Sequence, residues 1–556
     1  MDQEEMRPHV RVVCEELMFF SDFDSGNLAR AVKVAPCSVC AKQFELWVCP
    51  DAAERGITAY RSWFHFGIRG ARKGCRIKLS IVNLSPNKTL FGNHYKPVYQ
   101  LRPGPPFWTP FNGEVLYEAT SEQQAKLTWV FELDGGELEV FFACAYPYPY
   151  QQIRDSVAIH EKAATSDTYF YREVLARSLE GRDVELLTIS DASNFSSLRE
   201  SRPIGLFPTD LGRCHLALKP VIVVTARVHP GETPGSYMID GFLAAVLAQD
   251  RRGLLLRKNF VFKVVPVLNP DGVYHGNFRL DVNGVNLNRC YVDPDRASFP
   301  VIYSVKTYIN YLHTLGALAF YMDFHAQSSK PASFLFGNAL AEERQVDNEL
   351  YAKLVSLESH SFNFLYCDFS ERSMHSKDPK DHNSKEGSGR VAVHKSTGLV
   401  HCYTVECSYT AGRPTLVPVA RKNVSPGSSW AAYFELGVSC AVALLSYYDF
   451  FQLPKGGDFP NLEAVRNHIR TSIQLERIKT RLPRKGSTHL DSKADLRKDN
   501  LKSALGRTTP RAVHHLKVVS PMLNIEPHLP PLERSKDRTK TRRVLSVEGK
   551  MRRRPW

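Results

Sequence analysis

The chain has 556 residues, of which 43% are hydrophobic, and its formal net charge is +14 at pH 7. This length excludes a single ordinary domain, and the composition is that of a soluble globular protein with a sizeable core. From Lys455 onward the chain carries 25 Lys and Arg against 10 Asp and Glu, so residues 1–454 are close to neutral. The excess of basic residues is therefore confined to the C-terminal region from Lys455 onward.

The N-terminal residues and the cysteines both indicate a reducing compartment. The first five residues, Met1 to Glu5, are acidic and lack the basic and apolar regions of a signal peptide. Twelve cysteines without the spacing of a disulfide framework are expected to be reduced thiols. Cys37 and Cys40 are interpreted as ordinary loop thiols, with a zinc ribbon or a redox pair as the alternative. We therefore expect a cytoplasmic protein.

Residues 10–152 predict an N-terminal all-β sandwich domain. Residues 76–81 alternate polar and apolar side chains, which is typical of a half-buried strand. Residues 127–145 predict a hairpin with its turn at 134–136. The prolines within 146–150 end the sheet, because proline cannot donate to a strand ladder.

Residues 153–454 alternate between helix and strand. We expect helices near 170–180 and 235–249, and apolar strands at 184–189, 221–225, 260–268 and 318–322. Apolar strands separated by helices indicate a mixed sheet covered by helices on both faces. The long apolar stretch 433–451 is interrupted by acidic and hydroxyl residues, so it predicts a buried helix and not a membrane span. The chain is therefore expected to be multidomain, with an α/β domain second.

The C-terminal region changes in composition. A further helix is expected within 455–482, and residues 483–556 consist largely of Lys, Arg, Ser, Pro and Asp, which predicts a disordered basic tail. Such a tail can attract acidic protein partners by electrostatic steering, and the alternative is a nuclear-targeting or nucleic-acid patch. Because no aromatic residues interleave with the basic ones, nucleic acid is not expected as a partner.

A metal site is the leading interpretation of His229 and Glu232. They stand three residues apart after the apolar strand 221–225, on a turn that contains Pro230 and Gly231. His325 follows the apolar strand near 318–322 and offers a third ligand; two histidines and one glutamate are a known set for catalytic zinc with one open position. The alternative is a chance His-x-x-Glu pattern and an ordinary histidine.

Residues further along the chain could bind and polarise a substrate. Arg289 beside Asn288 suits a carboxylate, because a guanidinium offers a bidentate fork. Arg279 could stabilise a developing oxyanion, and Glu406 lies in an apolar strand, where a carboxylate is costly unless it is functional or paired. Solvated arginines and a satisfied strand glutamate are the alternative.

Together these motifs resemble the cytosolic carboxypeptidases, a branch of the zinc M14 metallocarboxypeptidases. The resemblance covers roughly residues 10–450 and rests on 229–232, 269–272, 284–289, His325 and Glu406. It implies a β-domain followed by an α/β carboxypeptidase domain. It also implies one Zn²⁺ per chain, held by His229, Glu232 and His325.

The resemblance further implies the roles of the remaining residues. Asn288 and Arg289 would hold the terminal carboxylate of the substrate, and Arg279 would polarise the scissile carbonyl. Glu406 would be the general base that takes a proton from the attacking water and passes it to the leaving amine. Around the third ligand the family usually has Asp-Leu-His-Gly-His, whereas this chain has Phe, Ala and Gln at positions 324, 326 and 327.

Two segments, 23–28 and 384–390, are most like those of a branch member that removes glutamate from tubulin, including branch-point glutamate. The implied activity is the removal of glutamate from polyglutamylated proteins such as tubulin, by a monomer in the cytoplasm that also reaches the cytoskeleton and nucleus. Lys385 and Arg390 are the candidates to bind the acidic side chain, and exposed loop charges are the alternative.

Two rival functions come from other classes. A small-molecule N-acyl amino acid deacylase, such as an aspartoacylase, shares the His-x-x-Glu and His layout but is shorter and lacks the β-domain. A non-catalytic adaptor would instead bind microtubules through the basic tail at 483–556.

Overall fold

The computed structural model describes residues 10–36, 42–53, 58, 60–92, 95–133, 138–209, 212–378, 382–409, 430–453 and 458–481. The predictions for Cys37 and Cys40, for the turn at 134–136 and for the tail at 483–556 lie outside these residues.

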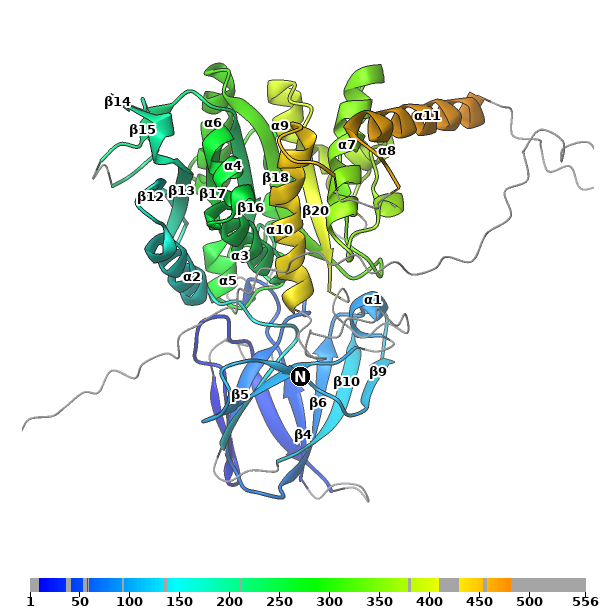
Figure 1. The fold of residues 1–556 in the computed structure, drawn as a ribbon. Coiled ribbons are helices and arrows are strands. Elements are labelled where there is room, and N and C mark those ends of the chain that lie inside the picture. The colour runs from blue at the N-terminus through cyan, green and yellow to red at the C-terminus, as the bar shows by residue number, and fades with distance from the viewer. Residues whose placement is uncertain are drawn as a thin grey trace, which may run out of the picture. The chain divides into compact units, whose positions relative to one another are not determined.

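The N-terminal part is a sandwich of two sheets (Figure 1). One sheet has the strand order β1-β2-β5-β11-β7-β8 and the other has the order β3-β4-β6-β10-β9. The strands are β1 Arg11–Cys14, β2 Leu17–Phe20, β3 Arg30–Val34, β4 Lys42–Trp47, β5 His65–Ala71, β6 Arg76–Leu84, β7 Val98–Arg102, β8 Thr109–Pro110, β9 Val115–Ala119, β10 Ala125–Glu132 and β11 Leu138–Ala143, with a short helix α1 Lys88–Phe91. The predicted all-β sandwich is confirmed.

The hairpin predicted over 127–145 is wrong. β10 pairs with β6 and β9, whereas β11 pairs with β5 and β7, so these consecutive strands lie in opposite sheets. Their inward-facing side chains meet across the core: the ring of Phe142 lies 5.6 Å from that of Trp129 and 5.1 Å from that of Phe131. Alternating apolar residues on both strands are equally compatible with a hairpin and with two facing sheets, which is why the pattern misled.

The second part is built on a seven-stranded mixed sheet with the order β12-β13-β17-β16-β18-β20-β19. Strands β17, β16, β18 and β20 are parallel, and the remaining neighbours pair antiparallel. The strands are β12 Thr168–Arg177, β13 Asp183–Asp191, β16 Val221–Ala226, β17 Val261–Val265, β18 Leu318–Gln327, β19 Phe334–Phe336 and β20 Cys402–Ser408, and β14 Phe195–Arg199 pairs separately with β15 His215–Ala217.

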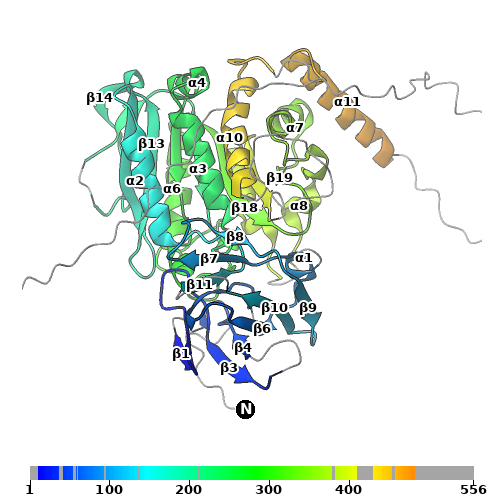
Figure 2. The same ribbon diagram turned by 60° about the horizontal axis from the view of Figure 1, so that its bottom comes forward.

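Helices cover both faces of this sheet, as predicted. In β16, Ile222 and Val224 pack on the side of α3 and α10, whereas Val221 and Val223 pack on the side of α6 and α9. Figure 2 shows α3 and α10 side by side. The helices are α2 Tyr150–Ala163, α3 Pro234–Leu247, α4 Arg251–Asn259, α5 Pro270–Tyr274, α6 Pro300–Thr314, α7 Glu342–Glu358, α8 Glu371–His375, α9 Gly389–Thr397, α10 Trp430–Tyr447 and α11 Leu462–Arg481, with single 3-10 turns η2 Ala192–Asn194, η3 Leu287–Arg289, η4 Phe364–Tyr366 and η5 Lys385–Gly387.

The helix predicted near 170–180 is also wrong, because this segment is strand β12. Its first residues, Thr168 to Tyr171, are β-branched or aromatic, which favours a strand. The strand then pairs along its whole length with β13, and the helix that precedes it is α2. The domain boundary predicted between residues 152 and 153 falls inside α2, which begins at Tyr150. This boundary remains a prediction.

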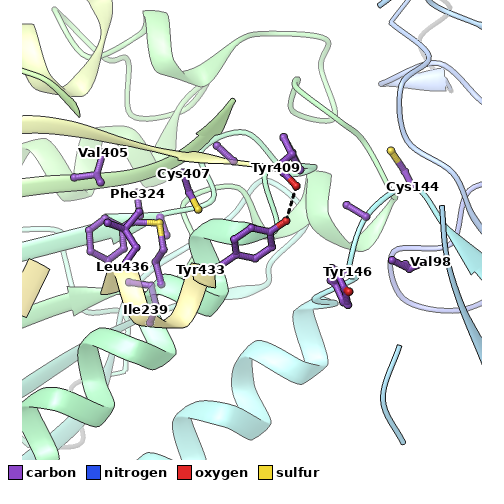
Figure 3. Packing of buried hydrophobic residues seen from close by; sticks show 14 of the residues in the cluster. Val98, Cys144, Tyr146, Ile239, Phe324, Val405, Cys407, Tyr409, Tyr433 and Leu436 are labelled. Carbon is purple, nitrogen blue, oxygen red and sulfur yellow. Dashed lines mark hydrogen bonds between the residues drawn. The ribbon is translucent and has the colours of Figure 1, made fainter. Parts of the chain in front are cut away.

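Helix α10 is long and apolar enough to cross a membrane by length and composition alone, but most of it is buried against α3 and α7. Figure 3 shows its packing: Leu436 lies with Ile239 and Phe324, and the Tyr433 hydroxyl donates to the Tyr409 carbonyl at 2.8 Å. The same apolar cluster extends to Val98 of the β-sandwich. Helix α11 lies within the range predicted for a last helix and packs on α7.

Candidate active site

The three predicted metal ligands come together at the ends of two adjacent parallel strands. His229 and Glu232 lie on the turn after β16, and His325 lies on β18. Nδ1 of His229 is 2.7 Å from Oε1 of Glu232, and Nδ1 of His325 is 2.9 Å from Oε2. All three side chains are buried, and one ligand atom from each lies within 4.8 Å of the others.

The second nitrogen of each histidine has an acceptor that fixes the orientation of the ring. Nε2 of His229 lies 3.1 Å from Oδ1 of Asn286, and Nε2 of His325 lies 2.9 Å from Oδ2 of Asp323. Histidines that bind a metal are oriented in this way. Neither Asn286 nor Asp323 is among the residues assigned a role from the sequence. The signal for Asp323 was a carboxylate inside an apolar strand, two residues before the histidine.

Three contacts hold the turn between His229 and Glu232 in place. Arg227, which has a φ of 59°, donates through Nε to the Pro230 carbonyl at 3.0 Å. The Tyr409 hydroxyl donates to the Gly231 carbonyl at 2.7 Å. The Gly231 amide donates to the Phe278 carbonyl at 2.8 Å. The turn therefore stays fixed through contacts with distant segments.

The donor set and its charges fit a zinc ion. Two imidazoles and a carboxylate are a known catalytic zinc set. Burial lowers the pKa of His229 to about 4, so its ring is neutral, as a ligand must be. Burial opposes the charge of His325, but the carboxylates of Asp323 and Glu232 hold its pKa well above the ordinary value. The site therefore stabilises positive charge between these carboxylates, which suits a divalent cation.

Arg279 and Arg289 meet at one carboxylate. Asp378 accepts through Oδ2 from Arg279 at 2.6 Å and from Arg289 at 2.7 Å. Two arginines that share one carboxylate oxygen form a concentrated positive site beside the metal ligands. The sequence offered no signal for Asp378, which lies in a polar loop.

Asn288 is buried beside Arg289 and binds the start of α9. Its Oδ1 accepts from the Gly389 amide at 3.0 Å. The η3 turn that carries both residues packs closely on η5, where the Gly387 carbonyl accepts from the Tyr291 amide at 3.0 Å. A Cβ at Gly387 would collide with the carbonyl of Arg289, so this approach requires glycine.

Glu406 lies on β20 directly opposite His325 in the parallel ladder. Burial raises the pKa of Glu406 to about 7, although the neighbouring His325 acts in the other direction. A carboxyl group with a pKa in this range can accept and return a proton near neutral pH.

Neither Lys385 nor Arg390 is an exposed loop charge. Arg390 is 3% exposed and donates to Asn338 Oδ1 at 3.0 Å, to the Ser373 carbonyl at 3.1 Å and to the Gly337 carbonyl. Among the described residues it has no ion pair.

The Lys385 ammonium lies 5.7 Å from the ring centre of Phe336 and has no hydrogen bond or ion pair with any described residue. The side chain is half-buried. Burial, and then Arg289 and Arg390, lower the pKa of Lys385. The charged form of Lys385 is therefore disfavoured in the free enzyme.

The departure from the family pattern around His325 does not displace the ligand. Phe324 packs in the core with its ring 6.1 Å from that of Phe242. The Ala326 amide donates to Oε2 of Glu232 at 2.9 Å, and Gln327 donates to a backbone carbonyl of the following loop.

Comparisons with known proteins identify the family of this chain. The family model described as zinc carboxypeptidase matches residues 158–336, and the model described as cytosolic carboxypeptidase N-terminal domain matches residues 19–146. Cytosolic carboxypeptidase-like protein 5 of Mus musculus is 33% identical over 604 residues, covering 83% of this chain and 68% of that protein. Cytosolic carboxypeptidase 6 of Homo sapiens is 28% identical over 478 residues, covering 84% and 85%.

Solved structures show the same fold. The crystal structure of a metallo-carboxypeptidase from Burkholderia cenocepacia superposes with a TM-score of 0.56 at 20% identity, covering 78% of this chain and 99% of that chain. A metallo-carboxypeptidase from Pseudomonas aeruginosa gives the same TM-score, identity and coverage. This chain therefore belongs to the zinc carboxypeptidase family and is a metallocarboxypeptidase with the N-terminal domain of the cytosolic branch.

Proposed function

We propose that this enzyme removes glutamate from polyglutamylated proteins such as tubulin, at chain ends and at branch points. The observation that carries the proposal is the buried Arg390 together with the half-buried Lys385, both without an ion pair among the described residues. Unpaired cations inside a site are costly unless a ligand supplies the opposite charge. A terminal glutamate supplies two carboxylates, one for these cations and one for Arg289 and Asn288.

The metal ligands in this proposal are His229, Glu232 and His325, which would hold one Zn²⁺. When bound, zinc acts as a Lewis acid that polarises a carbonyl and lowers the pKa of water. Arg279 lies beside the same site and would stabilise the oxyanion that develops on the scissile carbonyl.

Asn288 and Arg289 would bind the terminal carboxylate of the substrate. Because Arg289 already pairs with Asp378, the incoming carboxylate must share or replace that contact. Glu406 would take the proton from the attacking water and return it to the leaving amine, a task that suits a carboxyl group with a pKa of about 7.

The partner and the location follow from the same chemistry. The relatives are named cytosolic carboxypeptidases, which supports a cytoplasmic location. A tail with an excess of Lys and Arg after residue 483 would attract acidic protein tails such as those of tubulin, at the cytoskeleton or in the nucleus. The match to the N-terminal domain of the cytosolic branch argues against a small-molecule deacylase, because that class lacks the domain.

The test uses the purified full chain with zinc and two synthetic tubulin-tail peptides, one with a linear glutamate chain and one with a branch-point glutamate. Mass spectrometry follows the stepwise loss of glutamate. We expect the wild type to shorten the acidic peptides, Glu406→Gln to leave them intact, and deletion of residues 483–556 to preserve turnover. Equal, negligible release by wild type and Glu406→Gln would overturn the proposal. If that inactive wild type bound microtubules and the tail deletion did not, the adaptor would be favoured.

A further inference from the structure

A carboxylate of the β-sandwich binds the segment that carries Arg279. Asp51 lies in the loop after β4 and is 1% exposed. Its Oδ1 accepts from the Phe278 amide at 2.7 Å, and its Oδ2 accepts from the amides of Arg279 at 2.6 Å and Leu280 at 2.9 Å. Three consecutive backbone donors of the catalytic domain thus converge on one side chain that is more than 220 positions distant in the sequence.

This carboxylate has no cationic side chain as a hydrogen-bond or ion-pair partner among the described residues. Burial raises the pKa of Asp51 to about 6, and its backbone hydrogen bonds act in the opposite direction. A buried carboxylate without such a pair is costly, and the three amides are what satisfy it. If residue 51 only filled the interface between the domains, an apolar side chain would do so without the free-energy cost of desolvating a carboxylate. The presence of Asp51 therefore indicates that its hydrogen bonds are needed to hold the backbone of residues 278–280 in position.

The segment bound by Asp51 contacts two parts of the proposed active site: the turn between the metal ligands and the carboxylate of Asp378. The Phe278 carbonyl accepts from the Gly231 amide, inside the turn between the two metal ligands. The Arg279 side chain reaches Asp378 at 2.6 Å, beside Arg289. A displacement of this backbone would therefore move the oxyanion-stabilising arginine.

Further contacts of the β-sandwich fix the residues just before this segment. Asn27 donates to the Gly276 carbonyl at 3.1 Å, and the Ala52 amide donates to Oδ1 of Asn277 at 3.3 Å. Gly276 has a φ of 68°, and a Cβ there would lie 2.8 Å from the carbonyl of Gly26. The two segments approach closely and leave little room for adjustment.

We infer that Asp51 is a positioning residue for the carboxypeptidase reaction: from the β-sandwich it fixes the backbone of residues 278–280 and so places Arg279 against the scissile carbonyl. The inference rests on the role proposed above for Arg279. It assigns the N-terminal domain a part in the chemical step in addition to any part in folding. A misplacement of about 1 Å in such a group lowers the rate by roughly 100-fold.

The chain offers a matched control in Asp24. This second carboxylate of the β-sandwich also accepts two amides of the catalytic domain, those of Tyr150 at 3.1 Å and Gln151 at 2.7 Å. These donors stand at the start of α2 and have no hydrogen bond, ion pair or ring contact with residues 278–280. Replacing Asp24 removes interdomain hydrogen bonds of the same kind without touching the segment of Arg279.

The experiment compares Asp51→Asn, Asp24→Asn, Arg279→Ala and the double variant Asp51→Asn/Arg279→Ala in the zinc-loaded full chain. Asparagine keeps the size of Asp51 but offers only one acceptor oxygen. The substrate is a peptide ending in two glutamates, and kcat, KM, bound zinc and melting temperature are measured. We expect Asp51→Asn to lower kcat by roughly 10- to 100-fold, with KM changed by less than about 3-fold and zinc content unchanged.

The same account predicts that Asp24→Asn lowers the melting temperature but changes kcat by less than about 2-fold, and that Asp51→Asn costs less than about 3-fold in the Arg279→Ala background. If Asp51→Asn lowered kcat by the same factor in the wild type and in Arg279→Ala, the inference would be overturned. Equal changes in kcat for Asp51→Asn and Asp24→Asn would also overturn it. Loss of zinc or of the fold in Asp51→Asn would also overturn it, since the role assigned is positioning. If Arg279→Ala retained wild-type turnover while Asp51→Asn did not, the role proposed for Arg279 would fail instead, and Asp51 would act by another route.

Discussion

Replacing Lys385 by methionine isolates the charge that is proposed to bind the substrate side chain. Methionine keeps an unbranched apolar stem over the Phe336 ring, with sulfur in place of Cδ, and removes the ammonium. Because the Lys385 ammonium has no hydrogen bond or ion pair with the described residues, the substitution breaks no such contact with them in the free enzyme. The surrounding Arg289 and Arg390 disfavour its charge, so the melting temperature should stay unchanged or rise.

The expected magnitude follows from the half-buried position of this side chain. Two unit charges about 4 Å apart at an effective dielectric constant near 20 interact by about 4 kcal/mol. Desolvation and partial exposure reduce the net value to about 1 to 3 kcal/mol. That range corresponds to a loss of roughly 5- to 150-fold in kcat/KM for a substrate whose carboxylate meets Lys385.

The assay measures kcat/KM for two peptides that differ only in a terminal Glu or Gln. These side chains have nearly the same shape, so their ratio isolates the charge. We expect Lys385→Met to reduce the Glu-over-Gln preference by the calculated factor. Lys395→Met is the control, because Lys395 lies on the neighbouring α9, is 45% exposed and pairs with Glu386 at 3.2 Å.

Two results would refute this reasoning. An equal loss of kcat/KM with both peptides would mean that Lys385 shapes the site but does not interact with the charge of the substrate side chain. An unchanged preference would leave the buried Arg390 as the only remaining candidate of the two for the acidic side chain.

Two further predictions concern the zinc site and a carboxyl group on α7. Asp323→Asn and Asn286→Ala should each weaken zinc binding by roughly 10- to 100-fold in competition with a chelating dye. The first removes the negative charge beside Nε2 of His325, and the second removes the acceptor of Nε2 of His229. Unchanged affinity in both would contradict the assigned orientation. Burial raises the pKa of Glu349 on α7 to about 7, so the folded state favours the protonated form of this side chain. The resulting stabilisation is fully present below about pH 4.5 and is lost as the pH rises through 7. Glu349→Gln should therefore be more stable than wild type by about 1 to 2 kcal/mol at pH 8 and nearly equal at pH 4.5 in denaturant unfolding, and an advantage independent of pH would count against it.

The sequence was informative for the site residues that lie on parallel strands or just after them. His229, His325 and Glu406 stand on β16, β18 and β20 or directly after them, and these strands are parallel neighbours, so local pattern and spacing sufficed to group them. The mixed sheet with helices on both faces was predictable for the same reason, since continuous apolar strands need cover on two sides.

The remaining features depend on contacts between distant segments. Asp378 and Asp51 lie in loops whose function comes from the segment they approach, and no local pattern marks such residues. The errors over 127–145 and 170–180 have a related cause, because strand partners decide between a hairpin and facing sheets, and between a helix and an edge strand.

The most direct test of the central claim is the site and metal dependence of cleavage on a soluble peptide ending in glutamate. We expect the wild type to release single residues from the carboxyl end, to lose this activity with a chelator and to regain it with zinc. Glu406→Gln should bind zinc normally and release none. Cleavage inside the peptide, turnover that survives removal of the metal, or equal turnover by Glu406→Gln would contradict a zinc carboxypeptidase centred on these residues.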